Sequence, residues 1–210
     1  IICKYFLFFI IYAFLGWLME VLVSLYNKHK FVNRGFLIGP YCPIYGWGVL
    51  AILILVGQNT TDVLAVFLKS VFICSILEYS TSYVMEKIFN IRWWDYSQMR
   101  FNLNGRICLE GFFIFGFFSV TAVKNVQPHL THFLIQYDFI PMVIASTVCV
   151  TLFTSDFITT FIEATHLAKK LETVSKELKN FANELELDIH NEITTDDILK
   201  IGRQIKDGHR

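Results

Sequence analysis

The stretch that decides the fold is residues 5–26, which read YFLFFIIYAFLGWLMEVLVSLY and carry a single charge, Glu20. A helix of ~20 apolar residues crosses the ~30 Å hydrocarbon core of a bilayer. This stretch is therefore long enough to be a membrane span. Further apolar runs occupy residues 41–57, 62–85, 107–126 and 138–162, and the run at 41–57 is the shortest.

The composition agrees with several membrane spans. Of 210 residues, 54% are hydrophobic and 17% are charged, and the net charge is zero. Soluble domains carry about 25% charged residues, and nucleic-acid-binding domains are usually basic. These values argue against a soluble enzyme and against a nucleic-acid-binding protein. They predict an all-α, polytopic membrane helix bundle.

The placement of Lys and Arg predicts an orientation. If residues 41–57 span the membrane, loops 27–40 and 86–106 lie on one side and hold seven basic residues, while loops 58–61 and 127–137 hold none. The positive-inside rule then predicts five transmembrane helices, with the N-terminus outside and the C-terminus inside. A re-entrant second run would put the two basic loops on opposite faces. The short second run, which follows Gly39-Pro40, leaves both readings open.

The composition changes after the last run, which predicts a bundle over 1–162 and a cytoplasmic helical tail over 163–210. Apolar residues in the tail alternate at spacings of four and three: Leu167, Leu171, Val174, Leu178, Phe181 and Leu185. This stripe is typical of an amphipathic helix on a bilayer or bundle surface, or of a coiled coil with a partner. A short helix is expected after Thr194.

Charged residues within the apolar runs form the candidate site. A carboxylate in hydrocarbon costs ~2.5–3.5 kcal/mol on insertion scales, so each needs a reason. Arg106 lies four residues before Glu110 and would share its helix face. We expect one polar cavity in the inner half of the bundle, with two further residues at its mouth: Glu20, Glu78, Arg106 and Glu110 inside, Arg34 and Asp95 at the mouth. Such a cluster is a substrate or ion pathway, or a set of ion pairs that fixes helix packing.

The two basic loops are rich in aromatic residues. Residues 33–46, NRGFLIGPYCPIYG, are typical of irregular backbone packed against protein at membrane depth. Residues 102–106, NLNGR, predict a turn before the fourth helix, whose N-terminus and Arg106 suit an anionic group. Asp156, flanked by hydroxyl residues, is expected to have a structural role. Aromatic residues expected at the interface are Trp17, Trp93, Trp94 and Tyr96.

Several chemistries have no motif in the sequence. The five cysteines are odd in number and include no C-x-x-C pair, which argues against a disulfide framework or a zinc site. There is no P-loop, so we expect no ATP binding of that kind by this chain. The H-E-x-x-H and G-x-S-x-G motifs are also missing. We therefore expect no metal and no cofactor, and an enzyme is the less favoured reading.

Five segments of the first 126 residues carry a resemblance. They are residues 14–20 (FLGWLME), 32–46 (VNRGFLIGPYCPIYG), 77–79 (LEY), 93–97 (WWDYS) and 101–110 (FNLNGRICLE). They resemble the ABC-transporter type IV family, also called CmpB-type permeases. The resemblance implies a permease subunit of a bacterial cytoplasmic membrane whose ATPase is a separate chain.

Three functions follow as hypotheses. The first is a permease-like transport subunit working as a homo-oligomer or hetero-oligomer, with its tail docking the ATPase or another cytoplasmic partner. The second is an intramembrane enzyme acting on an anionic or lipid-linked substrate at the inner leaflet. The third is a non-catalytic membrane scaffold that uses the tail helix.

Overall fold

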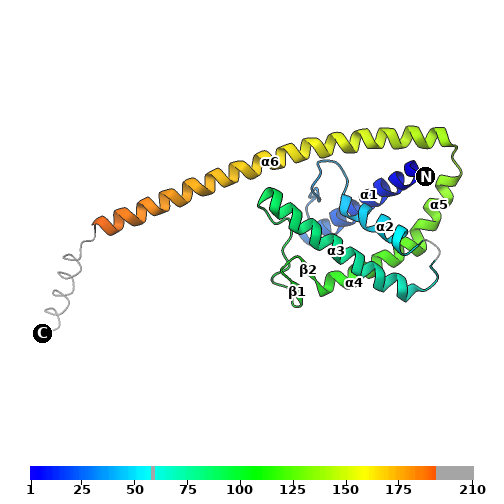
Figure 1. The fold of residues 1–210 in the computed structure, drawn as a ribbon, viewed down its shortest axis with the longest axis horizontal. Coiled ribbons are helices and arrows are strands. Elements are labelled where there is room, and N and C mark those ends of the chain that lie inside the picture. The colour runs from blue at the N-terminus through cyan, green and yellow to red at the C-terminus, as the bar shows by residue number, and fades with distance from the viewer. Residues whose placement is uncertain (58–59, 193–210) are drawn as a thin grey trace. The chain divides into compact units, whose positions relative to one another are not determined.

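A computed structural model describes residues 1–57 and 60–192, with side chains up to residue 184. Within these residues the regular structure is almost entirely helical (Figure 1). A small hairpin, β1 Asn102–Leu103 and β2 Ile107–Cys108, interrupts the helices. The predicted all-α class is confirmed. The short helix expected after Thr194 lies outside the described residues.

Four helices are long and apolar enough to cross a bilayer. They are α1 Ile2–Lys28, α3 Val63–Phe89, the helix formed by α4 Leu109–Thr121 with η1 Ala122–Val126 and α5 Gln127–Ile135, and α6 Phe139–Glu192. At ~1.5 Å per residue, a helix as long as α1 exceeds the ~30 Å hydrocarbon core. The predicted membrane helix bundle is therefore confirmed, with four long helices among the described residues.

The long helices begin and end at residues that satisfy free backbone groups. The Asp62 carboxylate accepts the backbone N–H groups of Leu64 (2.9 Å) and Ala65 (3.2 Å), which caps the N-terminus of α3. At the C-termini of α1 and α3, His29 and Asn90 adopt left-handed backbone conformations with φ of 52° and 54°. These caps stop both helices before the two long loops, 29–42 and 90–108.

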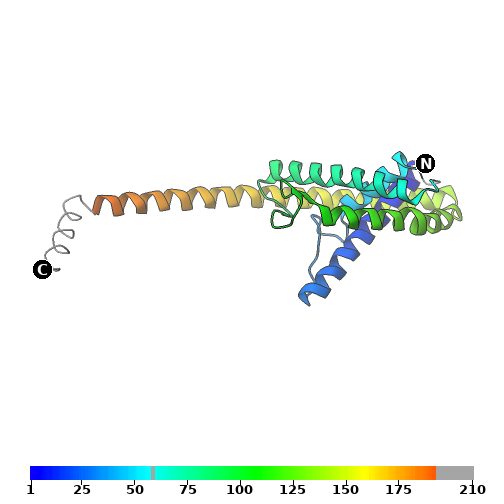
Figure 2. The same ribbon diagram turned by 90° about the horizontal axis from the view of Figure 1, so that it is seen from below.

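The second predicted span is the short helix α2, Pro43–Leu55. Its 13 residues extend ~20 Å, so α2 alone is too short to cross a bilayer. The backbone N–H of Cys42, immediately before α2, donates to the carbonyl of Ala13 in the middle of α1 (2.9 Å). Segment 29–42 therefore returns alongside α1 as non-helical backbone (Figure 2). A fifth crossing, made by this segment together with α2, stays a prediction.

Close approach of α1 and α2 requires glycine on both helices. A Cβ atom at Gly16 would overlap the ring of Tyr45, and one at Gly46 would lie 2.6 Å from the carbonyl oxygen of Phe9. Small residues allow helix backbones to approach in this way within a membrane. The apolar core lies where these helices meet α3, η1 and α5. Its buried side chains include Phe8, Phe9, Ile52, Leu53, Val66, Val123 and Leu134.

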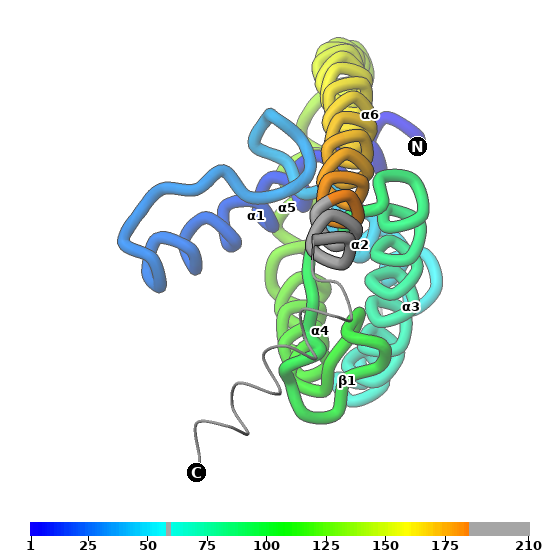
Figure 3. Tube along the Cα trace, turned by 90° about the vertical axis from the view of Figure 1, so that its left-hand side faces the viewer, coloured from blue at the N-terminus to red at the C-terminus, as the bar shows by residue number. Residues whose placement is uncertain are grey.

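Helices α3 and α4 form a second packed pair (Figure 3). The ring of Phe67 on α3 lies against Gly116 of α4, where a Cβ atom would overlap it. Beyond α4 the chain forms the π-helical turn η1, in which the carbonyl of Ala122 accepts the backbone N–H of Gln127 and also the Tyr12 hydroxyl (3.3 Å). Tyr12 also donates to Gln127 (2.9 Å), so a buried polar contact joins α1 to α5.

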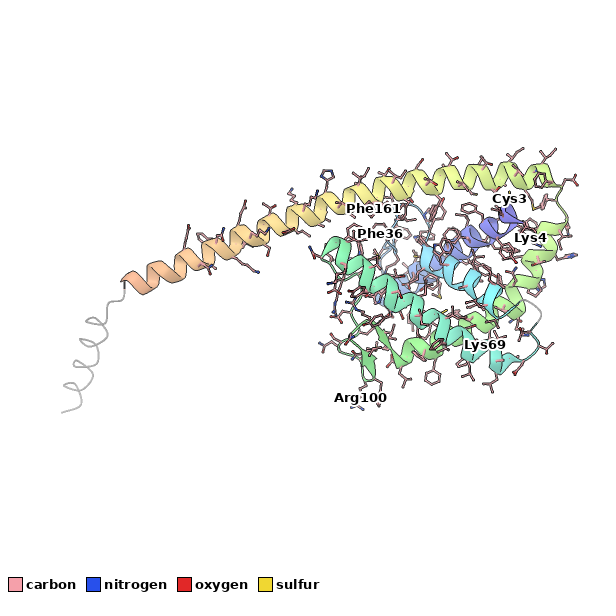
Figure 4. The ribbon with its side chains drawn as sticks, viewed as in Figure 1. Cys3, Lys4, Phe36, Lys69, Arg100 and Phe161 are labelled. Atoms are coloured by element: carbon pink, nitrogen blue, oxygen red, sulfur yellow. The ribbon has the colours of Figure 1, made fainter. Side chains whose placement is uncertain are left out.

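Aromatic side chains fix segment 29–42 against α3 and α6. Phe89, the last residue of α3, packs on Phe161 of α6, with ring centroids 5.5 Å apart, and on Phe36, at 5.6 Å. Trp93 packs edge-to-face on Phe36 at 5.3 Å. Figure 4 shows the side chains of Phe36 and Phe161 close together. This cluster holds the irregular segment in place.

The chain divides into two compact units, Ile1–Thr165 and His166–Arg210. In the second unit the described part of α6 carries the predicted apolar stripe, whose members are exposed: Leu167, Leu171, Val174, Leu178 and Phe181. Lys176 and Glu172, one turn apart, form an exposed ion pair at 2.7 Å. The stripe is therefore available to a partner or to a bilayer surface.

Candidate functional site

Residues 90–108 form a folded platform between α3 and α4. Asn104 and Gly105 both have positive φ, 53° and 67°, and the backbone N–H of Arg106 donates to the carbonyl of Leu103 (3.0 Å). This is the type I′ turn that an Asn-Gly pair favours in a two-residue hairpin. The Asn102 side chain accepts from the Gly105 backbone N–H and donates to the Met99 carbonyl. The turn predicted for residues 102–106 is therefore present.

The platform directs Tyr96 toward α3. The backbone N–H of Tyr96 donates to the Gly105 carbonyl (2.7 Å), and its hydroxyl donates to the Glu78 carboxylate (3.1 Å). Glu78 is buried, with 6% of its surface exposed. Burial raises the pKa of Tyr96, and so does its contact with Glu78. The phenol therefore keeps its proton and remains a donor to the carboxylate.

Glu20 on α1 has a tyrosine partner of its own. The Tyr45 hydroxyl, from the first turn of α2, donates to the Glu20 carboxylate at 2.6 Å. Ala13, Gly16 and Ser24, which lie on the same face of α1 as Glu20, are all buried. The charge of Glu20 also contributes to the raised pKa of Tyr96, after the larger effects of burial and Glu78. Glu20 and Glu78, from separate helices, thus lie within electrostatic range of the same phenol.

A polar row runs along α3. Its members are spaced four residues apart, so each lies one turn from the next and the row winds gradually around the helix: Ser70, Cys74, Glu78, Ser82 and Glu86. Cys74 contacts Ser119 of α4, with sulfur and oxygen 3.9 Å apart. The hydroxyl oxygens of Ser70 and of Ser75 are buried and have no hydrogen-bond partner in the described part of the chain. An unsatisfied buried hydroxyl costs ~1–3 kcal/mol, so Ser70 in the row and Ser75 beside it are unfavourable for stability.

Arg106 is buried beside the C-terminal end of the polar row. Its guanidinium pairs with Glu86 (2.6 Å) and donates to Ser82 (3.0 Å). It also lies over the rings of Tyr83 and Tyr79, 5.4 and 5.7 Å from their centroids. Arg92 binds the same Glu86 oxygen at 3.0 Å but is more exposed. Glu86 therefore neutralises the buried arginine and links the platform to α3.

The remaining predicted site residues lie apart from the two carboxylate–tyrosine pairs. Glu110 is exposed in the first turn of α4, and no polar contact of its side chain is found among the described residues. Asp95 is exposed; a hydrogen bond from the Ser97 backbone N–H lowers its pKa, and Arg92 lies 3.8 Å away. Arg34 is half-buried, and its Nε has no partner in the described residues. The structure thus gives Glu20 and Glu78 separate tyrosine partners, Tyr45 and Tyr96, and Arg106 binds Ser82 and Glu86 of the polar row.

The aromatic residues expected at the interface mostly use their polar atoms within the protein. Trp17 donates to Asn33 (2.6 Å), and Trp94 donates to the Arg106 carbonyl (3.0 Å). Tyr96 donates to Glu78, as described above, whereas Trp93 packs on Phe36 and is 44% exposed. Trp17, Trp94 and Tyr96 therefore hold the two long loops to the bundle.

Asp156 of α6 holds segment 29–42. Its carboxylate accepts the backbone N–H groups of Gly39 (2.8 Å) and Ile38 (3.2 Å), and the hydroxyl of Thr160 (3.2 Å). Asn33 closes the same segment by donating to the Ile38 carbonyl (2.7 Å). The irregular backbone is thus satisfied by protein groups, as non-helical backbone at membrane depth must be.

Two contributors, Tyr45 and Glu86, were not among the candidate site residues. Tyr45 stands in the quoted segment 33–46, but the sequence gives no sign of which carboxylate its hydroxyl reaches. Glu86 lies two turns beyond Glu78. Its position four residues after Ser82 could have identified it as a site residue from the sequence.

The cavities found beside α3 are apolar. One of about 550 Å³ is lined by Leu55, Val56, Leu68, Lys69, Phe72, Ile73 and Ile76, and one of about 290 Å³ lies between α3 and α4. Neither is lined by Glu20, Glu78 or Arg106. In the described residues no three His, Cys, Asp or Glu side chains gather closely enough to hold a metal ion.

Comparison with known proteins places the chain in a family. No curated protein and no protein of solved structure is significantly similar to it. The model of one family, described as "Putative ABC-transporter type IV", matches residues 7–161. That range contains the polar row of α3, the platform and both carboxylate–tyrosine pairs. Because the match covers well over half of the sequence, the chain belongs to the ABC-transporter type IV family of membrane proteins.

Proposed function

We propose that the chain is a permease-like subunit of an ABC-type transport system in the bacterial cytoplasmic membrane, with its N-terminus outside and its C-terminus inside. The observation that carries this proposal is that two carboxylates, Glu20 and Glu78, are each held by a tyrosine hydroxyl within a membrane helix bundle. Carboxylates inside a membrane are expensive and mark substrate or ion pathways in transport proteins. The family of the chain supports the same reading.

The proposed pathway has an interior and a margin. Glu20 and Glu78 line its interior, and Arg106 lies beside them on the inner side. Arg34, Asp95 and Glu110 belong to its margin, where they would meet a solute before or after the carboxylates. Each of these last three carries a charge that the buried hydrogen-bond network does not use.

The second crossing supports transport over a purely structural role. Irregular backbone at membrane depth occurs where it is buried in protein or lines a cavity. Transporters commonly place their binding sites at such interrupted helices. Here segment 29–42 reaches the middle of α1, and Tyr45, at the start of α2, binds Glu20. The interruption and the site therefore coincide.

The partners follow from the architecture. The bundle over 1–162 would form part of the translocation path, and such a small unit implies a homo-oligomer or hetero-oligomer. The chain has no P-loop, so a separate subunit would supply the ATPase. Residues 163–192, with their exposed apolar stripe, would dock that subunit or another cytoplasmic partner.

Profiling of metabolites and lipids tests this function against the enzymatic alternative. A deletion strain would be complemented with the native gene, with Glu78→Gln, or with Asp138→Asn as an exposed control. Transport predicts a solute whose distribution between cells and medium changes while its total amount is conserved, restored by the native gene and the control only. An enzyme predicts that one compound accumulates while its product disappears from cells and medium together. That second result would refute the transport proposal.

A further inference from the structure

We propose that Glu78 is a proton-binding site and that the polar row of α3 conducts protons to and from it. This inference rests on the proposed transport function and names the ion that the site carries. The proton would be taken up on one side, held on a Glu78 carboxyl oxygen in the neutral form, and released to the other side. No electron transfer and no other reactant is involved.

The first argument is the lack of a cation at Glu78. The carboxyl group is buried, and its hydrogen-bond partner in the described chain is a neutral phenol, Tyr96. No Lys, Arg or His of the described residues forms an ion pair with it. Arg106, which bonds to Ser82 one turn away, already pairs with Glu86. An uncompensated buried carboxylate costs several kcal/mol, so binding a proton is favoured.

The second argument is that the groups facing Glu78 act in opposite directions. Burial opposes the ionised form, and Glu20 of α1 is bound by Tyr45 of α2. From the platform, the Tyr96 hydroxyl stabilises the ionised form by donating to it, and Cys108 lies close to Tyr96. Cys74 and Ser82, on α3 itself, are neutral. These opposing effects allow both protonation states, which a proton carrier requires.

The third argument is the path. Ser70 and Ser75 lie on the outer side of Glu78, toward the start of α3, and their hydroxyl oxygens are buried without partners in the described residues. Ser82 and Glu86 continue the row toward the inner end, next to Arg106. Hydroxyl groups donate and accept in turn and can relay a proton. A metal ion is less suited to the site because it needs several oxygen ligands around it.

Infrared titration of the purified full-length protein in lipid nanodiscs tests the proposal. The probe is the proton alone, and the signal is the C=O stretch of a protonated carboxyl group. The native protein should show a band that disappears as pH rises, and Glu78→Gln should lack it. Glu20→Gln should keep the band, because Glu20 has its own partner, Tyr45. Tyr96→Phe should shift the frequency of the band, because the carboxyl group loses a hydrogen bond.

The controls separate this inference from the transport proposal. Glu163→Gln removes an exposed carboxyl group and should leave the band unchanged. Glu78→Asp keeps a titratable group and should restore a band if Glu78→Gln proves unstable. A band that persists in Glu78→Gln, or a midpoint that follows sodium or potassium concentration, would overturn the proton site. The titration needs no transport, so a failed transport assay with an intact Glu78 band would count against the proposed function only.

Discussion

Replacing Arg106 by alanine, and separately replacing Arg92, tests how the platform is held to α3. Both arginines bind the same Glu86 carboxylate, at 2.6 and 3.0 Å, but their side chains are 9% and 37% exposed. The structure therefore predicts unequal effects from two ion pairs of similar length. Arg100, an exposed residue of the same platform labelled in Figure 4, serves as the matched control.

The magnitude follows from the contacts that each arginine makes. Two unit charges ~4 Å apart attract by ~4 kcal/mol at an effective dielectric constant of ~20. Partial exposure of Glu86, 32% of its side chain, reduces this to about 2 kcal/mol. The hydrogen bond to Ser82 and the contacts with Tyr79 and Tyr83 together add about 1 kcal/mol. Arg106→Ala should therefore destabilise the protein by about 3 kcal/mol, whereas Arg92→Ala should cost at most about 1 kcal/mol.

Equilibrium unfolding of the purified variants in detergent micelles would measure these differences. Arg100→Ala should remain within about 0.5 kcal/mol of the native protein, as most exposed substitutions do. The double replacement of Arg106 and Glu86 should be less destabilising than the sum of the single ones, because each removes the partner of the other. Equal losses for Arg92→Ala and Arg106→Ala would refute the reasoning.

Three further predictions follow from the packing, the orientation and the tail. Gly16→Ala should destabilise the protein by about 1–3 kcal/mol by displacing Tyr45, whereas Gly48→Ala, whose Cβ would meet Leu77 at an ordinary 3.7 Å, should be tolerated in the same unfolding assay. Cysteine labelling should find positions 30, 99 and 179 inside and position 132 outside; opposite sides for 30 and 99 would contradict five crossings. A chain ending after Ala164 should still insert and fold but lose its cytoplasmic partner, and loss of all membrane-inserted protein would show a structural tail.

The long helices were predictable because apolar length is a property of the sequence alone. The limits of α4 and α5 were harder to predict. The fourth apolar run was expected to end at residue 126, but the helix continues through η1 to Ile135. The short second run reflects a local cause. Pro43 starts α2 and Gly57, with φ of 89°, follows its end, so only 13 residues are helical.

The candidate site was predictable only in part. Helix periodicity puts Glu20 on one face with Gly16 and Ser24, and Glu78 on one face with Ser75 and Ser82, and these four neighbours are buried. The expected shared face of Arg106 and Glu110 was wrong, because it assumed that residue 106 is helical. Arg106 instead belongs to the hairpin turn, and α4 begins at Leu109, so Arg106 reaches back to Glu86. Contacts between loop and helix, such as Tyr96 with Glu78, depend on tertiary structure that spacing alone does not encode.

A double-mutant cycle on Glu78 and Tyr96 tests the central claim most directly. The claim is that the platform places the Tyr96 hydroxyl on the Glu78 carboxyl group inside the bundle. Unfolding free energies of the native protein, Glu78→Gln, Tyr96→Phe and the double variant give the coupling energy between the two side chains. A buried hydrogen bond to a carboxyl group predicts a favourable coupling of about 1–2 kcal/mol. Additive effects, with no coupling, would contradict the account.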